Sequence, residues 1–198
     1  MSHSQLAERI RNRTVHLAII GQGYVGLPLA VEFARAGFSV IGIDTDLDRV
    51  GALQAGHSYT PDLASEDLRA LIRQGRYEAT SDFSVLERID VVLICVPTPL
   101  RKSKDPDISF IIAAASEVAA RFHPGQLVIL ESTTYPETTE ELLLPMFQGR
   151  GATVGEDFFL AFSPERIDPG NPTFKVRNIP GSGRRHARVH APGGHAVP

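Results

Sequence analysis

Residues 15–44 read 15-VHLAIIGQGYVGLPLAVEFARAGFSVIGID-44 and predict a strand, a helix and a second strand. The apolar run 15–20 stops at a glycine-rich turn, which is typical of a buried parallel strand. Apolar residues then recur at helical spacing over 24–37, and residues 38–44 predict the next strand. Two parallel strands joined by a helix are the repeating unit of parallel sheets.

The turn between the first strand and the helix is 21-GQGYVG-26, a G-x-G-x-x-G motif in its required context. Gly21 permits the tight turn, Gly23 leaves room for a pyrophosphate, and Gly26 lets the helix pack close to the strand. The amino end of the helix offers N–H groups and a partial positive charge to phosphates. The motif therefore predicts a dinucleotide site, and the alternative is a glycine-rich turn that serves packing only.

Asp44 ends the second strand eighteen residues after Gly26, where a ribose-binding acid is expected. Its carboxylate can accept hydrogen bonds from both ribose hydroxyls and would repel a 2′-phosphate, so NAD is favoured over NADP. Arg49 lies one turn into the following helix and is a candidate to flank the adenosine. The alternatives are that Asp44 only caps that helix and that Arg49 is a solvated charge.

Strands and helices continue to alternate along the chain. Further helices are expected at 46–56, 65–75, 108–122 and 137–147, and further strands at 77–82, 90–96, 126–132 and 157–163. This alternation predicts an α/β fold with a doubly wound, Rossmann-type parallel sheet covered by helices on both faces. We expect a single domain over residues 14–180, a flexible N-terminus at 1–13 and a disordered tail at 181–198.

Polar residues follow three of the expected strands, in 97-PTP-99, 131-ESTTYP-136 and 163-SPER-166. Ligands of open α/β sheets bind beyond the carboxyl ends of the strands. Thr98 and Thr133 are therefore placed to meet the cofactor or the reacting carbon. The alternative is that both hydroxyls are plain helix caps.

Composition excludes several classes of protein. The chain has 198 residues and a formal net charge of −3, which argues against a nucleic acid or a membrane surface as partner. No apolar run approaches the roughly 18 residues that span a bilayer, and the N-terminus lacks an apolar signal core. The single cysteine, Cys95, excludes an internal disulfide framework. We therefore expect a cytoplasmic protein.

The chain resembles the UDP-glucose/GDP-mannose dehydrogenase family of NAD-dependent nucleotide-sugar 6-dehydrogenases from residue 15 to about residue 180. The matching stretches are GQGYVGLPLA, GIDTD, CVPTPL, ESTTYPETTEE and SPERIDPGNP. The last two point to the branch that oxidises UDP-N-acetylglucosamine or UDP-N-acetylmannosamine for polysaccharide biosynthesis. The resemblance also implies a homo-oligomer and a UDP-sugar substrate.

Such enzymes oxidise the C6 alcohol of the sugar to a carboxylate with two molecules of NAD. A cysteine thiolate captures the intermediate aldehyde, because a thiolate adds readily to a carbonyl and leaves as a good group. The resemblance implies that Glu165 assists proton transfer or thioester hydrolysis at C6, and that Arg166 and Ile167 touch the nucleotide sugar. The alternative for Glu165 is a surface carboxylate paired with Arg166. The implied cofactor contacts are Gly21, Gly23, Tyr24, Val25, Gly26, Asp44, Arg49, Thr98 and Thr133.

Family members run to more than twice this length, and their catalytic lysine, asparagine and nucleophilic cysteine lie in the part that follows. Cys95 cannot replace that cysteine, because it lies in a strand predicted to be buried, where a thiol is a poor nucleophile. We therefore expect a chain truncated relative to the family, with the NAD-binding half only and no activity alone.

The last residues, 178-NIPGSGRRHARVHAPGGHAVP-198, contain no acid and no apolar period. One permitted coding of this stretch, shifted by one base, spells V-V-G-G-V-T-P, which resembles the family's continuation. We hypothesise a frameshift near residue 181 and an out-of-frame tail, which the coding DNA would test. His186, His190 and His195 suggest a metal site, but the surrounding glycines and prolines oppose the helix that would align them, so none is expected.

Two other functions fit parts of the sequence. A free-standing NAD-binding module with a regulatory role would need only the glycine motif and Asp44. A smaller dehydrogenase acting on hydroxyacids would use a base within this chain, but it assigns no role to ESTTYPETTEE or SPERIDPGNP.

Overall fold

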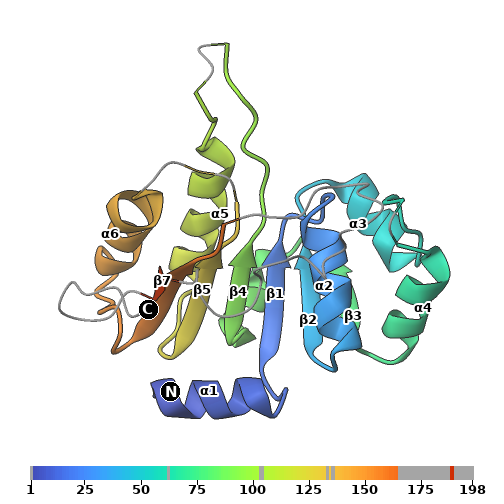
Figure 1. The fold of residues 1–198 in the computed structure, drawn as a ribbon, viewed down its shortest axis with the longest axis horizontal. Helices are drawn as coiled ribbons and strands as arrows, with labels where there is room; N and C mark the ends of the chain where they lie inside the picture. The colour runs from blue at the N-terminus through green and yellow to red at the C-terminus, as the bar shows by residue number, and fades with distance from the viewer. Residues whose placement is uncertain are drawn as a thin grey trace.

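A twisted sheet forms the centre of the protein in the computed structural model, which describes residues 2–61, 63–102, 105–132, 134, 137–164 and, for the backbone alone, 188–189. The seven strands of this described part are ordered β3-β2-β1-β4-β5-β6-β7 (Figure 1). Their bounds are β1 (His16–Ile20), β2 (Ser39–Ile43), β3 (Tyr77–Thr80), β4 (Val91–Ile94), β5 (Gln126–Leu130), β6 (Phe158–Phe162) and β7 (Arg188–Val189). Strands β1 to β6 are parallel, and β7 pairs antiparallel with β6.

The strand order reverses direction at β1. Ile19 of β1 lies opposite Gly42 of β2 on one side and Leu93 of β4 on the other. From β1 the chain moves outward to β2 and β3, and it then returns to place β4 on the free side of β1. This reversal creates a crevice beyond the carboxyl ends of β1 and β4, which is where doubly wound sheets bind ligands.

Helices cover both faces of the sheet. They are α2 (Gly26–Arg35), α3 (Leu47–Gln54), α4 (Ser65–Arg73), α5 (Ser109–Ala120) and α6 (Leu144–Gln148), with a 3₁₀ turn η1 (Phe83–Arg88) and a π-helical turn η2 (Thr138–Leu143). One core joins the sheet to α5 and α6 through Ile111, Val118 and Phe147. The other joins it to α2 and α4 through Leu27 and Leu68. The predicted doubly wound α/β class is confirmed.

Residues 1–13 differ from the flexible segment that we expected, because they contain helix α1 (His3–Arg11). Leu6 of this helix is only 3% exposed. Arg9 donates two hydrogen bonds to the carboxylate of Asp90, at 2.6 and 2.8 Å. Helix α1 therefore covers the amino-terminal ends of the central strands, beneath β1 and β4 in Figure 1.

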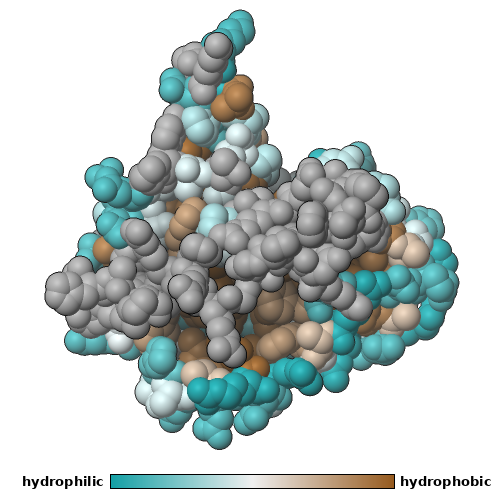
Figure 2. Space-filling model, in the orientation of Figure 1, coloured by the Kyte–Doolittle hydropathy of each residue, from teal (hydrophilic) through white to brown (hydrophobic). Residues whose placement is uncertain are grey.

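The connection from β4 to α5 projects beyond the sheet, at the top of Figure 1. Leu100 and Pro106 form an isolated antiparallel bridge, and Arg101 donates to the Asp107 carboxylate at 2.9 Å. Figure 2 shows apolar surface on this projection, where Leu100 is exposed, whereas the surface over α1 and α4 is mostly hydrophilic.

Two further expectations concern the ends of the chain and the membrane. Within the predicted tail at 181–198, the structure describes only the two residues of β7, and the rest lies outside the described residues. None of the helices described is long and apolar enough to cross a membrane.

Candidate cofactor site

The glycine turn between β1 and α2 is shaped by two close contacts and one open space. Gly21 has a φ of +92°, and a Cβ there would lie 2.5 Å from the carbonyl oxygen of Cys95. A Cβ on Gly26 would fall well inside van der Waals contact of the Gly21 carbonyl, so α2 begins directly against the turn. A Cβ on Gly23 would meet no atom within 4 Å. The space over Gly23 is thus available to a ligand that approaches the backbone closely.

The amino end of α2 lies at the same crevice, because its N-cap Val25 lines the cavity there. Val25, the N-cap, contributes no side-chain hydrogen bond to the helix. The N–H groups that begin a helix need partners, and an anion such as a pyrophosphate satisfies them while interacting favourably with the helix dipole. The arrangement suits the phosphate end of a dinucleotide.

A cavity of about 850 Å³ lies over the turn and the carboxyl ends of β1, β2 and β4. This volume falls within the range of small-molecule sites. Of the nine residues predicted as cofactor contacts, seven line the cavity: Gly21, Gly23, Tyr24, Val25, Asp44, Arg49 and Thr98. Gly26 is buried beneath the turn, and Thr133 lies outside the described residues. The structure thus brings the predicted residues of three separate segments to one place.

Asp44 is held firmly at the end of β2. It is 7% exposed, one carboxylate oxygen accepts a hydrogen bond from the N–H of Gln22 at 2.7 Å, and the other accepts from the N–H of Asp46 at 3.0 Å. Helix α3 is capped by Asp46, whose side chain accepts from the N–H groups of Asp48 and Arg49. Asp44 is therefore not the helix cap. A carboxylate has about four acceptor positions, so it can take ribose hydroxyls as well.

Arg49 folds back over the end of β2. Its Nη1 lies 3.7 Å from Asp44 Oδ2 and its Nε lies 3.3 Å from Asp46 Oδ2, while its side chain stays 48% exposed. The guanidinium plane therefore stands at the mouth of the cavity, where it can stack on a flat base. Arg49 is thus half-exposed to solvent and paired with two carboxylates at the end of β2.

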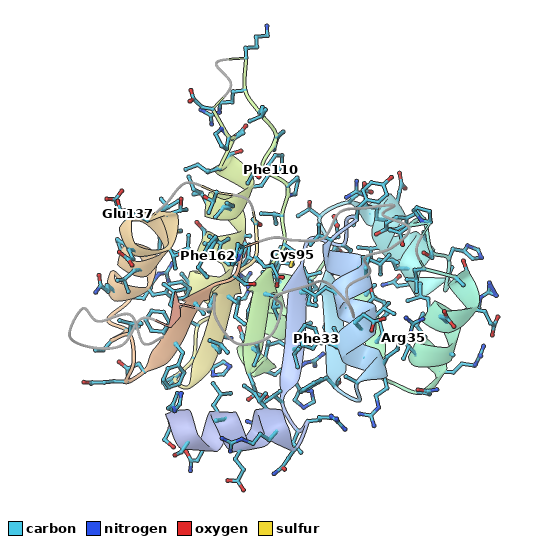
Figure 3. The ribbon with its side chains drawn as sticks, viewed as in Figure 1. Phe33, Arg35, Cys95, Phe110, Glu137 and Phe162 are labelled. Carbon is cyan, nitrogen blue, oxygen red and sulfur yellow. The ribbon has the colours of Figure 1, made fainter. Side chains whose placement is uncertain are left out.

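Several cavity residues were missed by sequence reasoning. Phe83 from η1 and Phe110, Ser116 and Glu117 from α5 line the wall opposite the glycine turn. Figure 3 shows Phe110 at the end of α5 from which the projecting connection rises, and its side chain is 47% exposed. Aromatic rings and a carboxylate suit the apolar faces and the amino group of a purine. No motif marks these residues, because they become neighbours only when α5 packs on the sheet.

Cys95 lies at the carboxyl end of β4, beneath the glycine turn (Figure 3). It is 7% exposed and is not part of a disulfide. A Cβ on Gly26 would lie 3.3 Å from the Cys95 Cβ, so the turn packs against this residue, which also belongs to the lining of the cavity. The predicted burial of Cys95 is confirmed.

The substrate end of the crevice is described only in part. Ser132, just after β5, donates a hydrogen bond to the Val96 carbonyl at 2.9 Å and so ties together the ends of β5 and β4. The predicted residues Thr133, Glu165, Arg166 and Ile167 lie outside the described residues, as does His186 with the other tail histidines. Within the described ranges, no group of three or more His, Cys, Asp or Glu side chains could hold a metal ion.

Residues 15–181 match the NAD-binding domain of the UDP-glucose/GDP-mannose dehydrogenase family. The chain belongs to this family. NAD is accordingly its cofactor. The glycine turn and Asp44 described above lie within the part of the chain that matches the NAD-binding domain of this family. The match begins at β1 and includes the glycine turn, Asp44 and Thr98.

Similar proteins carry related names. A UDP-N-acetyl-D-glucosamine 6-dehydrogenase of Salmonella typhi is 38% identical over 167 residues, which are 83% of this chain and 38% of that protein. A UDP-N-acetyl-D-mannosamine dehydrogenase of Pyrococcus horikoshii is 35% identical over 79% of this chain and 37% of its own length. The crystal structure of an NDP-N-acetyl-D-galactosaminuronic acid dehydrogenase from Methanosarcina mazei superposes with a TM-score of 0.75 at 34% identity, over 86% of this chain and 38% of that one. The chain thus spans less than two fifths of the length of these relatives.

Proposed function

We propose that this chain is the NAD-binding part of a dehydrogenase that oxidises the C6 hydroxyl of UDP-N-acetylglucosamine or UDP-N-acetylmannosamine to the uronate, for polysaccharide biosynthesis. The observation that carries the proposal is the cavity at the sheet reversal, which joins the glycine turn to the buried carboxylate of Asp44. The names of the similar proteins support the choice of a UDP-N-acetylhexosamine. The proposal includes a cytoplasmic location and the homo-oligomer that the family resemblance implies.

Different residues of the cavity would bind different parts of NAD. The N–H groups at the start of α2 bind the pyrophosphate over Gly23, where the structure has open space. Asp44 accepts hydrogen bonds from the adenosine ribose and disfavours a 2′-phosphate. Thr98 lines the cavity, and Thr133 directly follows the lining residue Ser132 in sequence, so these hydroxyls would orient the nicotinamide. The bound cofactor supplies the hydride acceptor.

The substrate would meet the segment that follows β6. On the family pattern, Glu165 would lie by the C6 carbon and move a proton, while Arg166 and Ile167 would contact the nucleotide sugar. Glu131 and Ser132 line the adjoining end of the cavity, which supports an entry for the sugar beyond β5.

This chain alone would bind NAD without producing the acid. Oxidation of an aldehyde to a thioester needs an accessible thiolate, and the only cysteine of the sequence is buried beneath the glycine turn.

Calorimetric titration with NAD, followed by an assay with UDP-N-acetylglucosamine and UDP-N-acetylmannosamine, tests the proposal. We expect binding of NAD, weaker binding of NADP, and no uronate in the product analysis. Reduction of NAD to NADH when 2-hydroxyacids are added would instead support the smaller dehydrogenase. Absence of NAD binding would refute the proposed function.

A further inference from the structure

Gln22, the second residue of the glycine motif, is fully buried although its side chain is polar. Its amide Nε2 donates to the carbonyl of Ile19 at 2.8 Å, and its Oε1 accepts from the hydroxyl of Tyr77 at 2.8 Å. Ile19 belongs to β1 and Tyr77 to β3, so the side chain passes beneath the turn and reaches across β2. A fully satisfied buried network of this kind holds its members in one arrangement.

The backbone of Gln22 is anchored as well. Its N–H donates to Asp44 Oδ2 at 2.7 Å, and its carbonyl accepts a hydrogen bond from the hydroxyl of Tyr59. Tyr59 comes from the connection between α3 and α4. Three segments that are distant in sequence therefore converge with β1 on one residue of the turn: the end of β2, the α3–α4 connection and β3.

Gly42 in the middle of β2 makes room for this network. A Cβ at this position would lie 2.5 Å from Gln22 Oε1 and 2.6 Å from the Tyr77 hydroxyl. Burial, followed by the charge of Asp44, raises the pKa of Tyr59 to about 12, and burial also raises the pKa of Tyr77. Both hydroxyls consequently stay protonated at neutral pH and remain hydrogen-bond donors to Gln22.

We propose that Gln22, Tyr59 and Tyr77 are positioning residues that fix the glycine turn relative to Asp44 and thereby set the preference for NAD over NADP. The turn binds the pyrophosphate and Asp44 binds the ribose of the same cofactor, so the two must keep a fixed separation. The hydrogen bond from Gln22 N–H to Asp44 is the direct link between them. A turn that moves away from Asp44 leaves this carboxylate farther from the ribose of a cofactor bound to the turn, which costs NAD its ribose hydrogen bonds and relieves NADP of the repulsion on its 2′-phosphate. The proposal rests on NAD binding in this cavity.

Two variants test the network. Tyr59→Phe removes the hydrogen bond to the Gln22 carbonyl and keeps the ring. The double variant Gln22→Leu with Tyr77→Phe replaces both members of the Gln22–Tyr77 hydrogen bond by apolar groups of similar shape, so that neither side chain leaves the other unpaired, although the Ile19 carbonyl also loses its bond from Gln22 Nε2. We expect the dissociation constant for NAD to rise roughly 3- to 10-fold in each, as for the loss of one or two hydrogen bonds. NADP binding should weaken less, because a displaced Asp44 repels the 2′-phosphate less.

Thr60→Val is the matched control. Thr60 is also buried in the α3–α4 connection, but its hydroxyl contacts Ser58 at 3.3 Å rather than the turn. This variant should lower the melting temperature while leaving the ratio of NAD to NADP affinity unchanged.

Titration calorimetry measures the affinities of the parent and the variants for NAD and NADP, and thermal unfolding measures their melting temperatures. A fall in the ratio of NAD to NADP affinity of both test variants, but not of the control, supports the proposal. Unchanged affinities in the test variants, or equal losses for NAD and NADP that follow the melting temperature, would overturn it while leaving NAD binding intact. Absence of NAD binding by the parent chain would instead refute the proposed function as well.

Discussion

Replacement of Asp44 by asparagine is the sharpest single perturbation of the site. Each carboxylate oxygen now accepts one backbone N–H, from Gln22 at 2.7 Å and from Asp46 at 3.0 Å. An asparagine side chain has only one acceptor oxygen, so its NH₂ group would face one of these donors. An orphaned buried donor costs about 1–3 kcal/mol, and for a domain of this size each kcal/mol lowers the melting temperature by about 2–4 °C. We expect Asp44→Asn to melt roughly 2–12 °C lower.

The same substitution should also weaken cofactor binding. A hydrogen bond to a charged acceptor contributes about 1.5–3 kcal/mol, which corresponds to a roughly 10- to 150-fold weaker affinity when it is lost. The affinity for NAD should fall by this factor. The affinity for NADP should fall less, because the charge that repels its 2′-phosphate is removed.

Titration calorimetry of parent and variant with both cofactors measures this shift. Asp48→Asn is the matched control, since it removes the same charge from an exposed position on α3 that does not line the cavity. A folded Asp44→Asn variant that binds NAD as tightly as the parent would show that Asp44 does not hold the ribose.

Three other perturbations test the glycine turn, helix α1 and the projecting connection. Gly26→Ala should abolish NAD binding and destabilise the chain, because its Cβ has no room against the turn, whereas Gly51→Ala in α3, where a Cβ meets nothing within 4 Å, should be neutral or stabilising in thermal unfolding. Leu6→Ala should lower the free energy of unfolding by about 2–5 kcal/mol in urea titration, and a change under about 1 kcal/mol would mean that α1 is not packed as described. The hydrogen bond from Arg101 lowers the pKa of Asp107 to about 2, so the folded carboxyl stays charged until well below the pH at which a free one protonates. An NMR pH titration should show that midpoint near 2 in the parent and a higher one in Arg101→Ala, and equal midpoints would contradict the assigned pair.

The parts of the fold that sequence predicted are those with strong local patterns. The strand 15–20, the glycine turn and the helix after it are marked by an apolar run, by glycines at fixed spacing and by helical periodicity. Asp44 is predictable because, in this fold, the acid that binds the ribose follows the glycine motif after a nearly fixed number of residues. Cys95 was judged buried because it lies inside an apolar run, and it is.

Helix α1 was missed because its sequence is mostly polar. Only Leu6 is buried in it, and Ile10 one turn later is partly buried, so the apolar face is too short to mark a helix. The one local signal was the capping box, in which the side chains of Ser2 and Gln5 each bond the other's backbone N–H. Besides the packing of Leu6, the helix is held by the long-range pair between Arg9 and Asp90, which no local pattern reveals.

The far wall of the cavity and the network at Gln22 were missed for a related reason. The motif leaves its second position unspecified, and nothing near Gln22 in sequence indicates burial. Its environment is set by Gly42 on β2 and Tyr77 on β3, which meet it only in the folded sheet. Such contacts depend on topology, so the sequence alone indicates the ligand but not the residues that orient its site.

A crystal structure of this chain with NAD would test the central claim most directly. The account predicts the pyrophosphate over Gly23 at the start of α2, with the hydroxyls of the adenosine ribose about 2.5–3.0 Å from the Asp44 carboxylate, the usual span of an O–H···O hydrogen bond. NAD bound outside the cavity, or with its adenosine ribose turned away from Asp44, would contradict it.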